Sequence, residues 1–333
     1  MLEPPPLSEE SIASRVAMEW GIDVAGLEFL ESHPDSYSWT CRVEAAGNSS
    51  FFLKLRNRAP DQSRLAVACY LAEHGVPEVV AALPTRESQL VAQHDGHWLT
   101  LFPFIEGTLA GDSVMVEDQW ISYGSVVRRV HDARLPGELR RQLRHEDFRP
   151  YWGEILSRAR KRMDAGLPDG DEIEREMAAL WTSRESAIRR LEEAFEALSS
   201  EVSALGVPFV LCHADIHAWN IMVDRDRRLR VIDWDDVMIA PRECDLMMVV
   251  GGLRSGLVSP EQEEWFRSGY GETQVDRRVL AFYRHVRALS DIAARAETVI
   301  LLPGLSPATK RDGLDGFVRL FEPGAIVDLA AST

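Results

Sequence analysis

Cysteines and long apolar stretches are scarce in this sequence. The four cysteines, Cys41, Cys69, Cys212 and Cys244, stand far apart and form no CxxC pair. In a chain of 333 residues this spacing argues against a disulfide framework or a zinc site, and it predicts reduced thiols and a cytoplasmic location. The longest apolar stretch, Leu246 to Leu253, is far shorter than the roughly 20 residues of a membrane-spanning helix, so no membrane partner is expected.

Basic residues are in deficit, and the N-terminus lacks a targeting pattern. The formal net charge is −16, which argues against a nucleic-acid partner because binding to phosphate backbones requires basic patches. The charge suits a cationic partner, yet many soluble proteins are simply acidic, so charge alone does not decide. Residues 1–6 carry no basic region followed by an apolar core and predict no secretion signal.

The remaining composition is that of a globular protein, with 45% hydrophobic and 27% charged residues and a length that suits one large or two modest domains. The first hundred residues predict two β-hairpins. Strands at Trp39–Glu44 and Phe51–Leu55 flank a polar turn, and strands at Gln89–Ala92 and Trp98–Phe102 flank an Asp-Gly turn.

Helices are predicted on either side of the first hairpin. Ser8, followed by two glutamates, is a plausible cap for the first helix. The second helix covers Gln62–His74 and ends at Gly75. The first helix has apolar residues along one face, which are Ile12, Val16 and Trp20.

Past Phe104 the sequence predicts mainly helices. Trp120, Val127 and Val130 share one face of a helix. The stretch Asp171–Ser199 predicts a helix packed on a core rather than a coiled coil, because sustained heptads are missing. Its apolar stripe consists of Ile188, Leu191, Phe195 and Leu198.

Three short apolar strands, at Phe209–Cys212, Ile221–Val223 and Leu229–Ile232, interrupt the helical part. The pattern therefore predicts an α+β fold with two lobes. The β-rich N-terminal lobe covers residues 1–104 and the helical C-terminal lobe residues 105–333, with a hinge at about residues 102–106 and a ligand site where the lobes meet.

Residues typical of phosphoryl transfer lie around these strands. Residues 213–220 read His-Ala-Asp-Ile-His-Ala-Trp-Asn, so Asp215 and Asn220 have the spacing of the kinase catalytic loop H-R-D-x-x-x-x-N. Asp233 ends the next apolar strand, from which a kinase aspartate binds magnesium. An isolated D-x-x-x-x-N is common, but its combination with a second aspartate and short strands is much rarer. The set predicts a kinase-type phosphotransferase.

The residue types suit this reaction, which needs positioning and charge neutralisation more than covalent chemistry. An aspartate with an ordinary pKa of about 3.9 is a weak base at neutral pH. Asp215 is therefore expected mainly to orient the acceptor hydroxyl, with proton transfer late in the reaction. Magnesium prefers oxygen ligands, which Asn220 and Asp233 would supply.

An alternative interpretation treats His213, Asp215 and His217 as metal ligands. A zinc or dinuclear hydrolase site needs further ligands, and the other close pair, His94 and His97, flanks a predicted turn in the other lobe. His213 is instead expected to order the loop backbone by hydrogen bonding.

A nucleotide also needs a cation. Lys54 lies in an apolar strand, as the lysine of the kinase V-A-I-K strand does, although alone it would be read as a solvent-facing residue. No G-x-G-x-x-G loop precedes it. Residues 32–39 occupy that place, and backbone N–H groups and hydroxyls there would contact the phosphates. Asp245 opens an apolar helix, where capping is its simplest role.

These residues resemble the aminoglycoside phosphotransferases, a family with the protein-kinase-like fold. The similarity spans nearly the whole chain and is most specific at Cys212–Asn220, Ile232–Asp235 and Ala240–Met247. Within the family the sequence is most similar to the spectinomycin phosphotransferase branch. The additional stretches that carry this similarity are Gly269–Glu272, Tyr283–His285 and Asp291-Ile-Ala.

The resemblance implies roles for individual residues. It implies Asp215 as the base, Asn220 and Asp233 as ligands of Mg2+, and Lys54 on the α and β phosphates of ATP. It also implies that the hinge around Phe102 and Phe104 holds adenine, that Asp245 braces the catalytic loop, and that the acceptor is a cationic aminocyclitol with ring hydroxyls.

The sequence departs from the kinase pattern in two places. The helix glutamate that pairs with the lysine in kinases has no clear counterpart, and the neighbourhood offers Asp61 and Gln62 instead. The partner of Lys54 is thus Asp61 or none. Trp219 stands directly before Asn220, a bulky neighbour that bears on the acceptor pocket.

The leading hypothesis is an ATP-dependent O-phosphotransferase, monomeric, that acts on an aminoglycoside or aminocyclitol in resistance or self-protection. GTP as donor stays open. The acidic candidates for binding ammonium groups are Asp235, Asp236, Glu272 and Asp291, although solvated surface positions would explain them equally well. Alternatives are a kinase of choline, a sugar, homoserine or a similar metabolite, and a non-catalytic nucleotide-binding scaffold.

Overall fold

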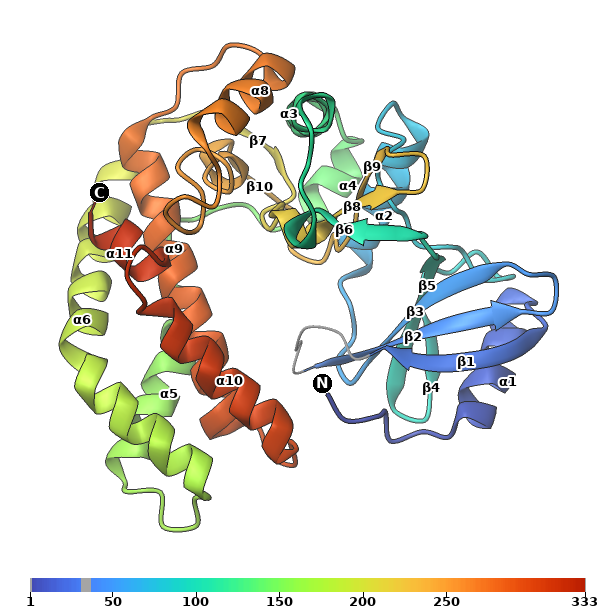
Figure 1. Cartoon of the computed structure of the whole chain (residues 1–333), viewed down its shortest axis with the longest axis horizontal. Coiled ribbons are helices and arrows are strands. Elements are labelled where there is room, and N and C mark those ends of the chain that lie inside the picture. Colours follow the sequence, from blue (N-terminus) through green and yellow to red (C-terminus); the bar gives the residue numbers. More distant parts are fainter. Residues whose placement is uncertain (1, 31–36, 333) are drawn as a thin grey trace. The chain divides into compact units, whose positions relative to one another are not determined.

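The computed structural model describes residues 2–30 and 37–332. The chain forms two compact units (Figure 1). The first comprises Met1–His145, Val210–Ala240 and Glu264–Glu272, and the second comprises Glu146–Phe209, Pro241–Glu263 and Thr273–Thr333. Residues 32–36, which belong to the segment expected to cover the phosphates, lie outside the described residues.

A five-stranded antiparallel sheet begins the first unit (Figure 1). In spatial order its strands are β1 (Val24–Leu30), β2 (Ser38–Ala45), β3 (Ser50–Arg56), β5 (His97–Pro103) and β4 (Ala92–His94). Both predicted hairpins are confirmed, although the first strand of the second hairpin is Ala92–His94 and shares only Ala92 with the predicted Gln89–Ala92. Its turn has Asp95 and Gly96 at φ 45° and 77°, as an Asp-Gly turn between two strands requires.

The two predicted helices of this region are also present. In α1 (Glu9–Trp20) the Ser8 hydroxyl accepts from the Ser11 N–H, and Ile12 and Val16 are buried. In α2 (Gln62–Glu73) the Asp61 side chain caps the N-terminus by accepting from the Ser63 N–H. Gly75 follows at φ 101°, a conformation that glycine adopts without strain.

Short strands of the first unit hold the segment around Asp215. A three-stranded sheet has the order β6 (Gly107–Leu109), β8 (Ile221–Asp224) and β9 (Leu229–Val231), and a two-stranded sheet pairs β7 (Phe209–Cys212) with β10 (Met238–Pro241). Strand β10 was not predicted. Short 3-10 turns, η1 (Ala110–Asp112) and η2 (Ala218–Asn220), lie beside these sheets.

The compact units divide the chain differently from the boundary expected near residue 104. Residues 105–145 and the strands around Asp215 belong with the N-terminal sheet. One contact that joins them is the hydrogen bond from the Val80 N–H to the Val231 carbonyl, 2.9 Å long. Another is the antiparallel pairing of β6 with β8, which joins residues 107–109 to the strand that follows the Asp215 loop.

Helix α3 (Glu117–Asp132) supports the segment around Asp215 from within the first unit, which also contains the short α4 (Gly137–Gln142). Trp120, Val127 and Val130 of α3 are buried, as predicted. Glycines allow close packing with α8 (Pro260–Tyr270), because a Cβ on Gly124 would overlap the Phe266 carbonyl and one on Gly269 would overlap the Ile121 carbonyl.

The second unit consists of helices (Figure 1). They are α5 (Gly153–Asp164), α6 (Glu172–Ser203), α7 (Glu243–Leu246), α9 (Arg277–Ala296), the π-helical turn η3 (Glu297–Leu301), α10 (Pro307–Leu320) and α11 (Ile326–Ala331). Helix α6 is capped by Asp171, and its stripe is buried at Ile188, Leu191 and Phe195 and half-buried at Leu198. It packs on α9, so the predicted core helix is confirmed. Among the described residues, no helix has the length and apolarity needed to traverse a lipid bilayer.

Candidate active site

The loop that carries Asp215 is held by its own backbone and by α3. It leaves β7 after Cys212, turns through η2 and enters β8. The Tyr123 hydroxyl of α3 donates to the Ile216 carbonyl, and the Asn220 N–H donates to the His217 carbonyl over 2.8 Å. Ala214 lies at φ 68°, a left-handed conformation that is rare for residues other than glycine and is often found at functional sites.

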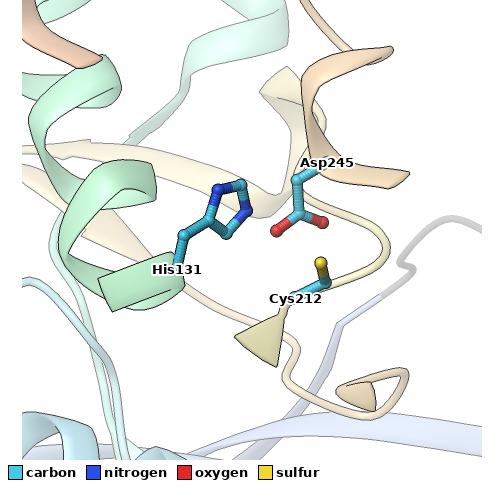
Figure 2. Close-up of side chains that lie close together, drawn as sticks. All are labelled: His131, Cys212 and Asp245. Atoms are coloured by element: carbon cyan, nitrogen blue, oxygen red, sulfur yellow. The ribbon is translucent and has the colours of Figure 1, made fainter. Parts of the chain in front are cut away.

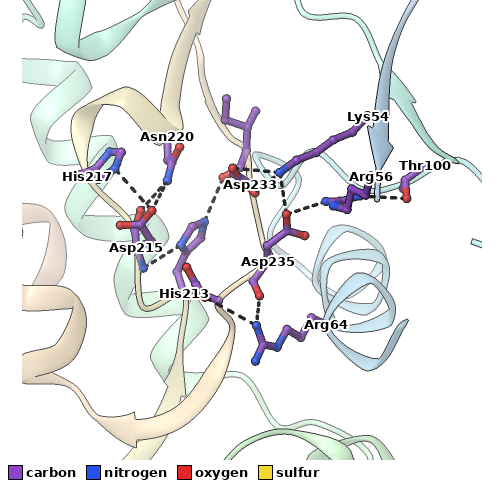
Figure 3. A network of polar contacts seen from close by, with 12 residues as sticks. Lys54, Arg56, Arg64, Thr100, His213, Asp215, His217, Asn220, Asp233 and Asp235 are labelled. Carbon is purple, nitrogen blue, oxygen red and sulfur yellow. Dashed lines mark hydrogen bonds and ion pairs between the residues drawn. The ribbon is translucent and has the colours of Figure 1, made fainter. Parts of the chain in front are cut away.

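Asp215 and Asn220 contact each other directly (Figure 3). The Asn220 amide nitrogen donates to the Asp215 carbonyl at 2.8 Å and to its Oδ2 at 3.0 Å. The Nε2 of His217 lies 3.5 Å from the same Oδ2. Because the amide nitrogen faces Asp215, the Asn220 amide oxygen faces away from it. The five-residue spacing thus places the Asn220 amide beside the Asp215 carboxylate.

His213 is buried and both of its ring nitrogens contact the loop backbone. Its Nδ1 accepts from the Asp215 N–H at 3.3 Å, so its Nε2 carries the proton and donates to the Ile232 carbonyl at 3.0 Å. The ring also packs against Trp234, with centroids 4.6 Å apart. These bonds leave no ring nitrogen for a metal, which removes one ligand from the alternative metal interpretation of the H-x-D-x-H segment.

Asp233 lies beside Asn220 because the strands pair there. The Ile232 N–H donates to the Asn220 carbonyl at 3.0 Å, which brings the next residue, Asp233, to the same end of the sheet. Asp233 itself has φ 58°, a second non-glycine residue of this site in the left-handed region. The Lys54 ammonium lies 3.2 Å and 3.4 Å from its two carboxylate oxygens.

Lys54 and Arg56 of β3 both bind Asp235 (Figure 3). The Oδ2 of Asp235 lies 2.7 Å from the Lys54 Nζ and 2.6 Å from an Arg56 guanidinium nitrogen. Both cations are almost fully buried, with 10% and 8% of their side chains exposed. The sequence had left Asp61 or no residue as the partner of Lys54. That expectation is wrong, since Asp61 instead caps α2 and lies 3.3 Å from Arg64.

The ion pairs separate the pKa values of the two aspartates. Burial, together with the neighbouring Asp235 charge, raises the pKa of Asp233 to about 6, although Lys54 opposes the shift. Burial also acts on Asp235, but Lys54 and Arg56 outweigh it and hold the pKa of Asp235 well below its ordinary value. At neutral pH both aspartates are therefore ionised, and protonation on acidification begins at Asp233.

The residues present fit a magnesium ion. Asn220 offers an amide oxygen turned away from Asp215, and Asp233 offers a carboxylate at the same end of the paired strands. Hard oxygen donors of this kind, few in number, suit Mg2+, which keeps several waters and takes its remaining ligands from phosphates.

The hinge aromatics take part in local packing. The Phe102 ring lies 6.4 Å from the Phe52 ring on the neighbouring strand, and the Arg42 guanidinium lies 4.6 Å above the Phe104 ring. The Phe104 N–H donates to the Ser50 carbonyl at 3.3 Å. The structure thus orders Phe102 near the end of β5 and Phe104 just after it, and their contact with adenine stays a prediction.

The four acidic candidates for substrate binding lie in different surroundings. Asp235 has two cationic partners already, which disfavours it as a site for an ammonium group. Asp236 is mostly exposed, 3.7 Å from Arg64. Glu272 is exposed in the first unit, whereas Asp291 lies on α9 of the second unit and pairs with Arg287 at 2.9 Å.

Cys212 and His131 are buried side chains of the first unit (Figure 2). The Cys212 thiol lies 3.6 Å from the Ala240 carbonyl, and the His131 Nδ1 lies 2.8 Å from the Tyr270 hydroxyl. Asp245, also drawn there, belongs to the second unit and is buried in α7. It does not cap that helix, because Arg242 occupies the N-cap position. Its bracing of the catalytic loop stays a prediction.

Trp219 packs on η1. A Cβ on Gly111 would lie 2.5 Å from its ring, and its indole N–H donates to an Asp112 carboxylate oxygen at 3.1 Å. The His217 ring lies edge-on at 6.0 Å. The bulky residue is therefore accommodated by a glycine and forms an aromatic pair beside the Asp215 loop.

Three residues of the site were missed from the sequence. Arg56 shares a strand face with Lys54 because it lies two positions on, a signal that could have identified it. Arg64 donates to the Asp235 carbonyl from α2, and Tyr123 holds the loop from α3. No local pattern marks these two, since each acts across a large separation in sequence.

Comparison with known proteins agrees with this geometry. The model of the phosphotransferase enzyme family (APH) matches residues 32–283. A crystal structure of spectinomycin phosphotransferase APH(9)-Ia in complex with ADP and spectinomycin has a TM-score of 0.86 at 27% identity, covering 98% of this chain and 99% of that one. Its AMP-bound complex gives 0.81 at 26% identity, with the same coverage.

A more distant structure, choline kinase LicA from Streptococcus pneumoniae, has a TM-score of 0.62 at 18% identity and covers 98% of this chain and 99% of that one. At this identity the likeness concerns the fold alone. It agrees with the protein-kinase-like α+β fold predicted from the sequence, which is confirmed. The chain belongs to the phosphotransferase enzyme family and is a phosphotransferase.

Proposed function

We propose that this protein is a magnesium- and ATP-dependent O-phosphotransferase whose acceptor is a hydroxyl of a cationic aminocyclitol of the spectinomycin type. The observation that carries the proposal is the contact of Asp215 with Asn220, next to Asp233 and Lys54. Similarity along nearly the whole chain to spectinomycin phosphotransferase supports the choice of acceptor.

Each residue has a distinct part in this reaction. Asp215 accepts a hydrogen bond from the acceptor hydroxyl and aims its oxygen at the γ-phosphorus of ATP. As the new P–O bond forms, the bond from the γ-phosphorus to the β,γ-bridging oxygen breaks, and ADP leaves with that electron pair. The hydroxyl proton passes late to Asp215 and then to water. Asn220 and His217 orient the Asp215 carboxylate.

The nucleotide is held by cations and by the metal. Lys54 contacts the phosphates. Asn220 and Asp233 would hold Mg2+, which would supply positive charge against the phosphate charge that develops during transfer. Phe102 and Phe104 border the adenine site. We assign ATP rather than GTP as donor because the related complex contains ADP.

A cytoplasmic enzyme of resistance or self-protection fits these properties. The four cysteines form no disulfide among the described residues, which suits a reducing compartment. Burial, with the charge of Glu9 adding to it, raises the pKa of the Cys41 thiol to about 11, so that this thiol stays protonated and unreactive.

A panel of acceptors tests the function. Purified protein with MgATP is assayed for ADP release against spectinomycin, other aminoglycosides, choline, homoserine and sugars. Turnover with a cationic aminocyclitol, far above the ATPase background, is expected. Turnover with choline, homoserine or a sugar alone would reassign the acceptor, and no turnover together with no nucleotide binding would reject the kinase assignment.

A further inference from the structure

Helix α2 lacks the acid that a kinase uses to hold its strand lysine. In protein kinases the lysine of β3 pairs with a glutamate from the following helix, and activity requires that pair. Within α2 the single acid is Glu73, which is exposed at the last position of the helix. The N-cap residue Asp61 is occupied with Ser63 and Arg64. Neither residue is paired with Lys54.

Asp235 supplies the missing carboxylate from another direction. Its Oδ2 lies 2.7 Å from the Lys54 Nζ, closer than either oxygen of Asp233, at 3.2 Å and 3.4 Å. Asp233 also fits a magnesium ion, so metal binding and Lys54 compete for it. Asp235 is therefore the acid that remains with Lys54 when the metal is bound.

Arg56 fixes Asp235 independently of Lys54. Its guanidinium donates to Asp235 Oδ2 at 2.6 Å and to the Thr100 hydroxyl of β5 at 3.3 Å. Two cations therefore share one carboxylate. When phosphates draw the Lys54 charge toward them, Arg56 still compensates the half-buried charge of Asp235.

The helix contributes through a cation instead of an acid. Arg64 of α2 donates to the backbone carbonyl of Asp235 and lies 3.7 Å from the carboxylate of Asp236. The helix thus steadies the Asp235 segment, which in turn steadies Lys54. Helix α2 is thus linked to Lys54 through Asp235. The helix contributes a cationic side chain, Arg64, where the helix of a kinase contributes a glutamate.

We propose that Asp235 is the positioning residue of Lys54, held by Arg56 and Arg64, and takes the part of the helix glutamate of kinases. The inference rests on the proposed function, since it assumes that Lys54 contacts nucleotide phosphates. If Asp235 positions Lys54, it is not available to bind the acceptor. Its role is then in binding the nucleotide donor.

Nucleotide titration tests the role without any acceptor. The dissociation constant of MgADP is measured by calorimetry for the wild type, Asp235→Asn, Asp235→Glu, Lys54→Met and the double variant Asp235→Asn/Lys54→Met. Asp235→Asn is expected to weaken binding about tenfold and Asp235→Glu less, while kcat/KM for ATP in the Asn variant falls about 10²-fold because Lys54 is misplaced. The double variant is expected to bind no more weakly than Lys54→Met alone.

Matched controls separate the possible outcomes. Glu73→Gln removes an exposed acid of the neighbouring helix and should leave MgADP binding unchanged, and thermal melting confirms that each variant is folded. Additive effects of the Asp235 and Lys54 substitutions would overturn the proposal. A higher half-saturating Mg2+ concentration in Asp235→Asn at fixed nucleotide, with Lys54→Met unaffected, would instead make Asp235 a metal ligand and also overturn it. If wild-type protein binds MgADP but phosphorylates no aminocyclitol, the proposed acceptor is wrong. The role of Asp235 can still be tested, because the nucleotide titration uses no acceptor.

Discussion

At the scale of the residue, the site is built from a few side chains whose protonation is set by their neighbours. Asp233 and Asp235 stand two positions apart, yet their pKa values shift in opposite directions. The cause is the distribution of cations, because Asp235 faces both Lys54 and Arg56 whereas Asp233 faces Lys54 alone. The raised pKa makes Asp233 more sensitive to mild acidification than Asp235.

Magnesium-dependent nucleotide binding should therefore weaken below about pH 6. Only the ionised carboxylate can hold the metal, so the proton competes with Mg2+ from the raised pKa of about 6 downward, instead of from the ordinary value near 3.9. The apparent Mg2+ affinity is expected to fall about tenfold per pH unit below that point. The apparent Mg2+ affinity is measured by calorimetric titration of Mg2+ at saturating ADP. The titration covers about pH 5 to about pH 8, which includes the raised pKa.

The variant Asp233→Asn is the matched control for this titration. It keeps the shape of the side chain and loses the titrating group, so any remaining pH dependence comes from the phosphates of the nucleotide. If the wild type and Asp233→Asn lose affinity with the same slope, Asp233 does not titrate in this range and its assignment as metal ligand is weakened.

The residues proposed to act directly could be predicted from the sequence, and those that hold them could not. Asp215, Asn220 and Asp233 are candidates because reaction chemistry restricts both residue type and spacing. Arg64 and Tyr123 bind backbone carbonyls, for which many donors would serve, so no pattern marks them. The partner of Lys54 was misjudged because Asp235 lies far from it in the sequence.

At the scale of the element, local patterns predicted helices and hairpins well. Ser8, the Asp-Gly turn and the stripe in α6 each depend on neighbouring residues only. Strand β10 was missed because its four residues, Met238–Pro241, carry no period of their own and pair with β7 from a distance. Its existence depends on tertiary contacts.

The packing of α3 on α8 should not tolerate a larger side chain in place of Gly269. Gly269→Ala places a methyl group on the Ile121 carbonyl, and the helices must separate to relieve the overlap. We expect a loss of about 2 kcal/mol in the free energy of unfolding. Urea denaturation followed by circular dichroism measures this change.

Gly47→Ala is the control for this substitution. It lies in the turn between β2 and β3, and a Cβ there meets no atom within 4 Å. Its free energy of unfolding should stay within about 0.5 kcal/mol of the wild type. Equal loss in both variants would mean that the close approach of α3 and α8 does not limit stability.

At the scale of the whole molecule, the predicted fold class agrees with the structure, whereas the predicted boundary differs from that of the compact units. Composition separated a β-rich beginning from a helical remainder, but the strands around Asp215 join the first unit through long-range pairing. The candidate acids for the acceptor are spread over both units, so specificity depends on tertiary arrangement that residue types alone do not disclose.

The net charge of −16 should affect the acceptor more than the donor. A negative field attracts a cationic aminocyclitol and is screened by salt. Raising NaCl from about 20 to about 200 mM should lower kcat/KM for the acceptor about two- to tenfold. The same change should not lower kcat/KM for anionic MgATP to that extent, and a parallel fall for both substrates would show that the field does not select the acceptor.

We propose that Asp215 acts on the acceptor while Asn220 and Asp233 serve the metal-bound nucleotide. Turnover and MgATP binding in the variant Asp215→Asn test this division of roles. The substitution keeps the contact with Asn220 possible but removes the carboxylate, so kcat should fall by about 10³-fold or more with the dissociation constant of MgATP nearly unchanged. Turnover close to that of the wild type, or loss of MgATP binding in a folded variant, would contradict it.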